Sequence, residues 1–243
     1  MSRTLSEVAA EASTCTKCRL AEGRTQVVFG VGDPNADLMF VGEAPGFHED
    51  KQGEPFVGAA GQLLTRMLGE IGLARDDVWI CNVLKCRPPG NRDPLEDEIE
   101  ACTPWLVEQI SLIQPRVIVT LGNFATKYVL QTQQGITRMR GATYPWHGRT
   151  VIPTFHPAAI LHGGGERSPQ VGLLREDFTL IGRTLEEISQ SREDVSPDDV
   201  VILPDLPSGG ATTATPPGSI ARPAFDRPSA VDAEPDEEQM ELF

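Results

Sequence analysis

The chain has 243 residues, 40% of them hydrophobic, and a formal net charge of −14. This length and hydrophobic content predict one sizeable folded domain with an appendage, and they exclude a wholly disordered chain. No stretch approaches the roughly 20 apolar residues of a membrane span, and the polar N-terminus is unlike a signal peptide, so we expect a soluble, cytoplasmic protein.

The charge is distributed unevenly along the chain. Residues 189–243 hold 12 acidic and 3 basic side chains, so −9 of the net charge lies there. This segment is also rich in Pro, Gly, Ser and Thr and has no hydrophobic periodicity. We therefore predict a folded domain over residues 1–188 and a disordered acidic tail over residues 189–243. The folded part can still present a local basic surface to nucleic acid.

The predicted strands and helices alternate along the chain. Four apolar runs predict strands, and they span residues 37–42, 78–85, 116–122 and 150–155. Apolar residues at helical spacing predict helices that contain Leu63, Ile99 and Leu173. The order predicts an α/β fold, a three-layer α/β/α sandwich with a central, mostly parallel four-stranded sheet. In such sheets, ligands bind at the carboxyl ends of the strands.

Unusual residues lie at those strand ends. The sequence "GEAPG" follows the first strand, and its glycines permit a tight loop whose amides point into a cleft. Asn82 ends an apolar run, and a buried carboxamide needs hydrogen-bond partners. His156 ends the last strand, and Phe56 follows the glycine loop. Each residue alone is compatible with a structural role, but together they predict a site.

The five cysteines are not expected to form structural disulfides in an intracellular protein. Cys15 and Cys18 form a C-x2-C pair, and Cys86 and Cys102 are separated by 15 residues. If the four converge, they form a tetrathiolate site, which both zinc and an iron–sulfur cluster accept. Cys81 lies within a strand and is expected to be a packed thiol.

Several motifs in order resemble one known family. They are "GEAPGFHEDKQGEPFVGAAGQLL", "NVLKCRPPGNRDP", "FHPAAIL" and the cysteine spacing. Together they resemble the family 4, or iron–sulfur, uracil-DNA glycosylases over roughly residues 5–188. The resemblance implies a 4Fe-4S cluster held by Cys15, Cys18, Cys86 and Cys102. It also implies a monomeric base-excision repair enzyme that flips deoxyuridine out of DNA and hydrolyses the N-glycosidic bond. Uracil and an abasic site are the products, without a lyase step.

The resemblance also implies roles for the residues at the strand ends. Phe56 stacks on uracil, and Asn82 pairs with uracil N3–H and O4, so that cytosine leaves buried groups unpaired. Neutral His156 donates a hydrogen bond to O2 as negative charge develops there. Glu43 stabilises the sugar cation or orients the attacking water. The expected remaining substrate contacts are at Gly42 and Ala44.

The loop departs from the G-Q-D-P-Y sequence of family 1 enzymes, because Ala44 replaces the catalytic aspartate and Gly46 the tyrosine that excludes thymine. We expect Glu49 to exclude the thymine methyl group instead. Ile160 is expected to be the wedge that fills the gap left by the flipped nucleotide. The expected phosphate contacts are Lys85, Arg87, Arg92 and Arg167.

The chain closes with "QMELF", which resembles the short peptide by which bacterial replication and repair proteins bind the sliding clamp. Gln239, Leu242 and Phe243 are the expected contacts, on a tether that leaves the catalytic domain on DNA. Two alternatives to uracil excision stay open. One is a glycosylase for another deaminated base, such as hypoxanthine or a modified uracil. The other is a non-enzymatic iron–sulfur module that binds DNA or the clamp.

Overall fold

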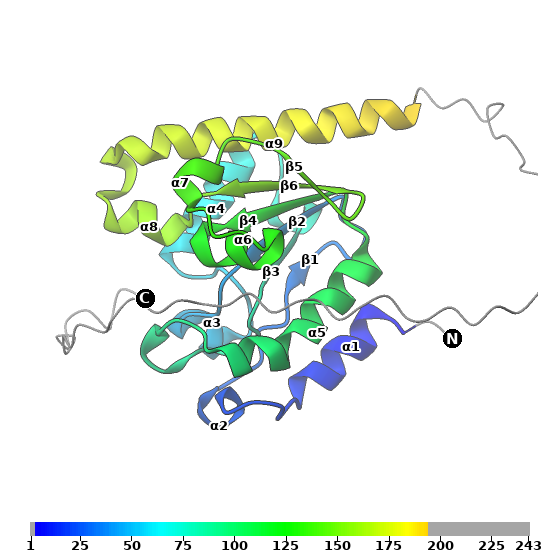
Figure 1. The fold of residues 1–243 in the computed structure, drawn as a ribbon, viewed down its shortest axis with the longest axis vertical. Helices are drawn as coiled ribbons and strands as arrows, with labels where there is room; N and C mark the ends of the chain where they lie inside the picture. The colour runs from blue at the N-terminus through cyan, green and yellow to red at the C-terminus, as the bar shows by residue number, and fades with distance from the viewer. Residues whose placement is uncertain (1–2, 194–243) are drawn as a thin grey trace, which may run out of the picture.

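The computed structural model describes residues 3–193, without the side chains of Glu166 and of residues 191–193. The predicted disordered tail and its clamp-binding peptide at residues 239–243 lie outside the described residues. Within them, a six-stranded sheet has the order β1-β3-β2-β4-β6-β5 (Figure 1). No described helix is both long and apolar enough to cross a membrane.

The four predicted strands form the centre of this sheet and run parallel to one another. They are β2 (Leu38–Gly42), β3 (Trp79–Asn82), β4 (Val117–Leu121) and β6 (Arg149–Thr154). The predicted count of four strands was too low, because two short antiparallel strands extend the edges. They are β1 (Val31–Gly32) beside β3 and β5 (Tyr144–Trp146) beside β6. Strands of two and three residues are too short to show an alternating pattern.

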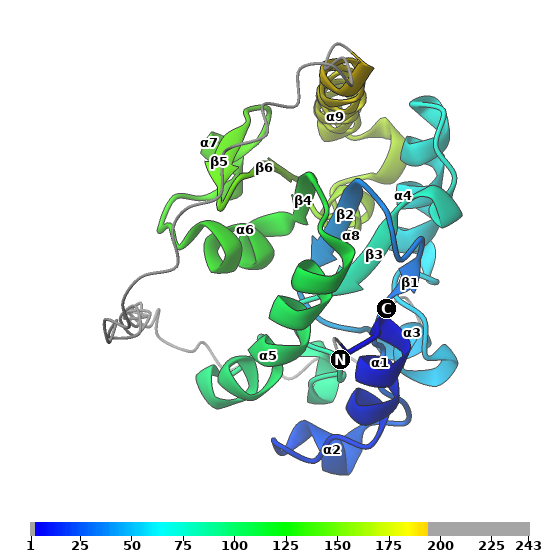
Figure 2. The ribbon, with the colours of Figure 1, turned by 90° about the vertical axis from the view of Figure 1, so that its right-hand side faces the viewer.

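Helices cover both faces of the sheet, as Figure 2 shows in the view along its edge. On one face lie α1 (Leu5–Ser13), α5 (Glu96–Ile113) and α6 (Gly122–Leu130). On the other face lie α4 (Ala59–Glu70), α8 (Pro157–His162) and α9 (Pro169–Glu193). The shorter helical segments are α2 (Leu20–Gly23), α3 (Phe47–Gln52), α7 (Ile136–Met139) and 3₁₀ turns at Arg75–Asp77, Pro89–Asn91 and Gly165–Arg167.

The residues of β2 explain why both faces need cover. Met39 and Val41 pack into the core under α1, α5 and α6, whereas Leu38 and Phe40 pack into the core under α4, α8 and α9. All four are nearly inaccessible to solvent, as expected for a strand in the middle of a parallel sheet. The ring of Phe40 stacks on that of Phe178 in α9, with centroids 5.9 Å apart. The predicted three-layer sandwich is confirmed.

Strand register determines which residues meet at the carboxyl edge. Gly42 at the end of β2 pairs with Asn82 at the end of β3. Leu121 at the end of β4 pairs with Thr154 of β6, two residues before His156. The four parallel strands therefore deliver the glycine loop, the carboxamide and the imidazole to the same edge of the sheet.

Candidate active site

A pocket of about 290 Å³ opens at this edge. That volume is at the lower end of the range for small-molecule sites, which is roughly 300–1,000 Å³, and it suits a single base. Its lining includes most of the predicted site: Glu43, Ala44, Glu49, Phe56, Asn82, Arg92 and His156. The remaining lining residues are Pro45, Gly46, Gly58, Ala59, Ala60, Pro88, Asn91, Ala158, Leu161 and His162.

Asn82 is buried at the base of the pocket, with only 2% of its surface exposed. Its Oδ1 atom is buried without a hydrogen-bond partner among the described residues. Such an orphaned acceptor costs about 1–3 kcal/mol unless a ligand or water supplies a donor. A Cβ atom on Gly42 would collide with this oxygen and lie 2.7 Å from Cζ of Phe56. Gly42 is therefore the residue that lets the carboxamide and the ring approach each other.

Phe56 is held in an unusual backbone conformation. Its φ of +55° lies in the left-handed region, which a bulky residue occupies only when its surroundings enforce it. Glu49 Oε1 accepts hydrogen bonds from the main-chain N–H groups of Val57 and Gly58, both at 3.0 Å. Arg75 donates to the carbonyl oxygen of Phe56 at 3.1 Å and to that of the preceding residue at 2.8 Å. The ring is thus fixed from both sides of the loop.

His156 lines the pocket beside Phe56 and is the N-cap residue of α8. Its Nδ1 accepts a hydrogen bond from the main-chain N–H of Ala158 at 3.2 Å, so the neutral imidazole carries its proton on Nε2. Burial lowers the pKa of His156 to about 4, and the nearby carboxylate of Glu49 only partly opposes that effect. At neutral pH the side chain is therefore an uncharged Nε2–H donor.

Glu43 follows directly after β2 and is half-buried. Burial, with a smaller contribution from the negative charge of Asp93, raises the pKa of Glu43 to about 7. Its carbonyl oxygen accepts a hydrogen bond from Leu84 N–H at 3.0 Å, which continues the pairing of β2 with β3 beyond both strands. The carboxylate therefore changes its charge in the physiological pH range while its main chain stays fixed.

The four predicted cysteine ligands line a second, small cavity beside α1 and α5. The main-chain N–H of Lys85 donates to Cys102 Sγ at 3.2 Å, and Arg24 Nη1 donates to Cys86 Sγ at 3.6 Å. Such N–H donors suit the sulfur atoms of a metal-bound thiolate. Among residues 3–193, however, no three His, Cys, Asp or Glu side chains are spaced to hold one metal ion. The thiols thus share a cavity without meeting around a single ion, whereas the ligands of a four-iron cluster are spread over separate irons.

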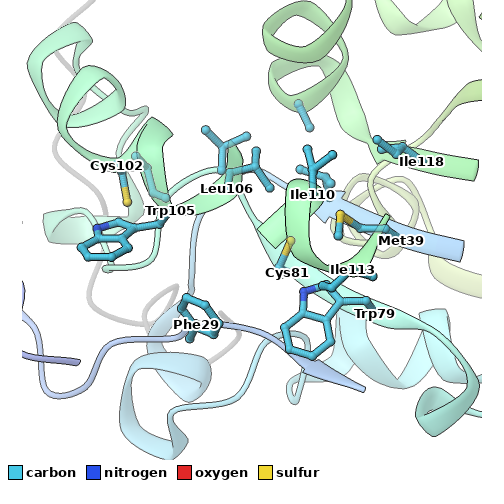
Figure 3. Close-up of a cluster of buried hydrophobic side chains, with 14 of the residues drawn as sticks. Phe29, Met39, Trp79, Cys81, Cys102, Trp105, Leu106, Ile110, Ile113 and Ile118 are labelled. Carbon is cyan, nitrogen blue, oxygen red and sulfur yellow. The ribbon is translucent and has the colours of Figure 1, made fainter. Parts of the chain in front are cut away.

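Cys81 lies apart from this cavity. It is completely buried in the hydrophobic core, and Figure 3 shows it beside Met39, Trp79 and Ile110, whereas Cys102 lies next to Trp105 at the far side of the cluster. Burial raises the pKa of the Cys81 thiol. This agrees with the expected packed thiol.

Two predicted DNA contacts are contradicted by burial. Lys85 was expected to bind phosphate, but it is 1% exposed, and its Nζ donates to Asn82 O and Gln109 Oε1 inside the core. Ile160 was expected to be the inserting wedge, but it is fully buried in the core under α8. Its neighbour Leu161 lines the pocket instead, because successive residues of a helix point about 100° apart.

The three predicted arginine contacts differ in their surroundings. Arg92 lines the pocket and forms a bidentate ion pair with the buried carboxylate of Glu98, at 2.5 and 2.9 Å. Arg87 is half-buried and donates to Asn91 Oδ1 at 2.7 Å. Arg167 is exposed in the 3₁₀ turn before α9. None of the three positions opposes a phosphate contact.

Sequence reasoning missed the groups that hold the pocket together. Arg75 supports the Phe56 loop although it lies 19 positions further along the chain, and no local pattern marks it. Leu161 is the last residue of the quoted "FHPAAIL" motif and His162 follows it. The helical period would have separated Leu161 from Ile160. The support that Glu49 gives to the Phe56 loop depends on a turn geometry that a sequence does not display.

The sequence of this chain is similar to those of several known proteins. Residues 29–178 match the model of the uracil DNA glycosylase superfamily. A type-4 uracil-DNA glycosylase of Sulfurisphaera tokodaii is 51% identical over 186 residues, which cover 73% of this chain and 83% of that protein. Type-4 uracil-DNA glycosylases of Saccharolobus solfataricus and Archaeoglobus fulgidus are 46% and 48% identical. Those matches cover 73% and 72% of this chain and 85% and 87% of the two relatives.

Proposed function

We propose how the pocket works from the premise that this chain belongs to the type-4 uracil-DNA glycosylases of the uracil DNA glycosylase superfamily. It excises uracil from DNA in base-excision repair, as a monofunctional glycosylase. The residue roles that follow are proposals. The observation that carries them is the orphaned Oδ1 of Asn82 at the base of a pocket sized for one base.

The flipped uracil lies with its face on the phenyl ring of Phe56 and its O2 edge towards His156. Asn82 Oδ1 accepts a hydrogen bond from uracil N3–H, and Nδ2 donates to O4. Cytosine presents an acceptor at N3 and donors at N4, so it leaves the buried carboxamide unpaired. The packing of this carboxamide against Gly42 supports a fixed reading of the base.

Heterolysis of the N-glycosidic bond leaves its electron pair on uracil and a positive charge on the sugar. His156 donates from Nε2–H to uracil O2, where the negative charge develops, and its low pKa keeps that donor neutral. The Glu43 carboxylate, when ionised, stabilises the sugar cation or orients the attacking water. Water adds to C1′ and loses a proton, and uracil takes up a proton at N1.

We propose that Glu49 has two tasks. Its Oε1 holds the Phe56 loop through two main-chain N–H groups. The carboxylate also occupies the space over uracil C5 and excludes the thymine methyl group, because Gly46 has no side chain to do so. The nearness of Glu49 Oε2 to Gly46, 2.8 Å from where a Cβ would lie, supports this placement.

Cys15, Cys18, Cys86 and Cys102 would hold a 4Fe-4S cluster, which fits their shared cavity and the N–H donors to two of the sulfurs. When bound, the cluster supplies covalent links between the N-terminal segment, the exit of β3 and α5. Excision proceeds on the residues of the pocket. We infer no redox step.

DNA contacts beyond the base are proposed at the pocket rim. Leu161 takes the place of Ile160 as the wedge, and Arg87, Arg92 and Arg167 contact phosphates. We propose that the "QMELF" peptide binds a sliding clamp. We also propose that the enzyme acts as a monomer in the cytoplasm, at the nucleoid. Deleting residues 239–243 should abolish clamp pull-down while excision from free oligonucleotides stays intact, and unchanged pull-down would discard the clamp proposal.

The roles are tested with a labelled oligonucleotide that contains one uracil, single-stranded or paired with guanine. Hot alkali cleaves the strand wherever a base has been removed. Asn82→Ala and His156→Ala should each lower single-turnover excision by about 10²-fold or more. A variant that stays folded and iron-loaded and excises at the wild-type rate would remove that residue from the mechanism. Parallel hypoxanthine and thymine substrates test the range of lesions.

A further inference from the structure

We propose that Lys85 is a positioning residue that ties the uracil-reading Asn82 to the four-cysteine centre. The proposal rests on the proposed roles of Asn82 and of the cysteines. It assigns a task to a side chain that the glycosidic chemistry does not use and that cannot reach DNA. The assignment follows from two contacts of Lys85: its main-chain N–H binds the sulfur of Cys102, and its Nζ binds the main-chain oxygen of Asn82.

The main chain of Lys85 belongs to the cysteine centre. Its N–H donates to Cys102 Sγ at 3.2 Å, and the next residue is Cys86. Its carbonyl oxygen accepts a hydrogen bond from Val28 N–H at 2.8 Å, which fixes the strand exit from the opposite side. Lys85 is also one of the residues that line the cysteine cavity. The position of this backbone is therefore set where the thiols are held.

The side chain of Lys85 turns back through the core to the main chain of Asn82. Nζ donates to the main-chain oxygen of Asn82 at 2.7 Å and to Gln109 Oε1 at 2.6 Å. Gln109 is itself fully buried, and its Nε2 donates to Phe29 O at 2.8 Å. Asn82 O and Gln109 Oε1 accept from Lys85 Nζ, and Phe29 O accepts from Gln109 Nε2, so these hydrogen bonds fix the orientation of the Gln109 amide. Any displacement of Nζ leaves the carbonyl group of Asn82 without its partner and frees the residue that carries the carboxamide.

Burial explains why this residue implies an anionic neighbour. Lys85 is 1% exposed, and its Nζ donates to two neutral oxygen atoms and also interacts with the buried thiol of Cys81. An ammonium group so deeply buried is strongly disfavoured unless a negative charge compensates it. A cluster held by the four thiolates of this cavity would carry net negative charge. The cation therefore stabilises that centre while it orients the strand end.

The test is inhibition of the iron-loaded, full-length enzyme by free uracil, measured beside the affinity for DNA with an abasic site. Lys85→Met keeps the stem and removes the ammonium group. We expect the inhibition constant for uracil to rise about tenfold or more, since two buried acceptors lose their donor, while abasic-site affinity stays the same. Iron should also be lost faster to a chelator. Lys17→Met is the matched control, because Lys17 lines the same cavity but is exposed and lies over the ring of Trp105.

A double-mutant cycle separates positioning from general destabilisation. In an Asn82→Ala background, Lys85→Met should have no further effect on uracil inhibition, because the group that it positions is gone. An equal effect in both backgrounds, or an unchanged inhibition constant in the single variant, overturns the proposal. If Lys85→Met does not fold, Gln109→Met replaces it, since it removes the second acceptor that orients Nζ. The same selective and non-additive weakening is then expected, and its absence has the same meaning.

The cycle also separates this inference from the mechanism on which it rests. If Asn82→Ala leaves uracil inhibition unchanged, the proposed reading of the base by Asn82 fails, and the Lys85 proposal fails with it. If Asn82→Ala weakens inhibition and Lys85→Met does not, only the positioning role fails.

Discussion

The ring of Phe56 lies 5.6 Å from the imidazole of His156, centroid to centroid, with the planes tilted by 34°. The two side chains come from opposite halves of the chain, one on the loop before α4 and one at the N-terminus of α8. Their tilted rings give a base one face to stack on and one polar edge to contact. Glu49 and Arg75 hold the Phe56 loop by hydrogen bonds to its main chain. The two rings are therefore in place before DNA binds.

The activity of the enzyme should depend on pH through Glu43. Because the pKa of Glu43 is raised to about 7 and that of His156 is lowered to about 4, ionisation of Glu43 is the step that changes across neutral pH. We expect kcat/KM to rise with pH through about 7. Asp93→Asn should move this limb to lower pH, since it removes one cause of the raised pKa. Glu43→Gln should be slow and should lack the limb; a limb that persists in this variant contradicts the assignment.

Gly42→Ala should displace Asn82 and Phe56 at the base of the pocket. The new Cβ would collide with Asn82 Oδ1 and press on the Phe56 ring, and overpacking of this kind costs about 1–3 kcal/mol. We expect excision to fall about tenfold or more, with a lower free energy of unfolding. Gly69→Ala in α4 is the control, because its added Cβ would meet nothing within 4 Å beyond its chain neighbours and the backbone of its own helix. That variant should be active and slightly stabilised, and equal activity of the two variants would contradict the pocket geometry.

Two substitutions of Glu49 separate its proposed tasks. Glu49→Gln keeps an oxygen that accepts from Val57 and Gly58, so the Phe56 loop and uracil excision should be largely preserved. Glu49→Ala removes both the acceptor and the bulk near C5. It should lower uracil excision and begin to bind or cleave thymine, as measured on matched U·G and T·G oligonucleotides. Unchanged discrimination against thymine in the alanine variant would end the exclusion role.

The cysteine assignment predicts a contrast between two buried thiols. Cys102→Ser should lower the iron content per chain and the brown colour, because Cys102 lines the shared cavity. Cys81→Ser should leave the iron content unchanged, since Cys81 lies in the apolar core beside Met39 and Trp79. Iron analysis of both purified variants decides this point, and loss of iron from the Cys81 variant would move that thiol into the ligand set.

Neighbouring residues of α8 should respond differently to truncation. Ile160→Ala opens the core and should lower the free energy of unfolding by about 2–5 kcal/mol. Leu161→Ala should lower the free energy of unfolding less, because Leu161 is only partly buried against the core. It should slow excision from duplex DNA more than from single strands, because only a duplex leaves a gap to fill. Denaturant unfolding and excision from both substrates provide the comparison. Equal slowing on both substrates would remove Leu161 as the wedge.

The sequence alone determined the three-layer fold and the edge at which the site lies. Strand–helix alternation requires a parallel sheet covered on both faces, and all four predicted strands are present. The same local patterns predicted that Glu43, Phe56, Asn82 and His156 lie at one site, because parallel strands align their carboxyl ends. Only the two edge strands were missed, since two or three residues form no period.

The tertiary structure decided what each side chain faces. A lysine beside two prolines and an arginine resembles a surface cation, yet packing turns Lys85 inward to Asn82 and Gln109. A one-residue step along α8 separates the buried Ile160 from Leu161 at the pocket. The support of Phe56 by Arg75 joins residues that no local pattern connects. These outcomes depend on side-chain direction and on long-range hydrogen bonds, which the linear spacing of residues does not contain.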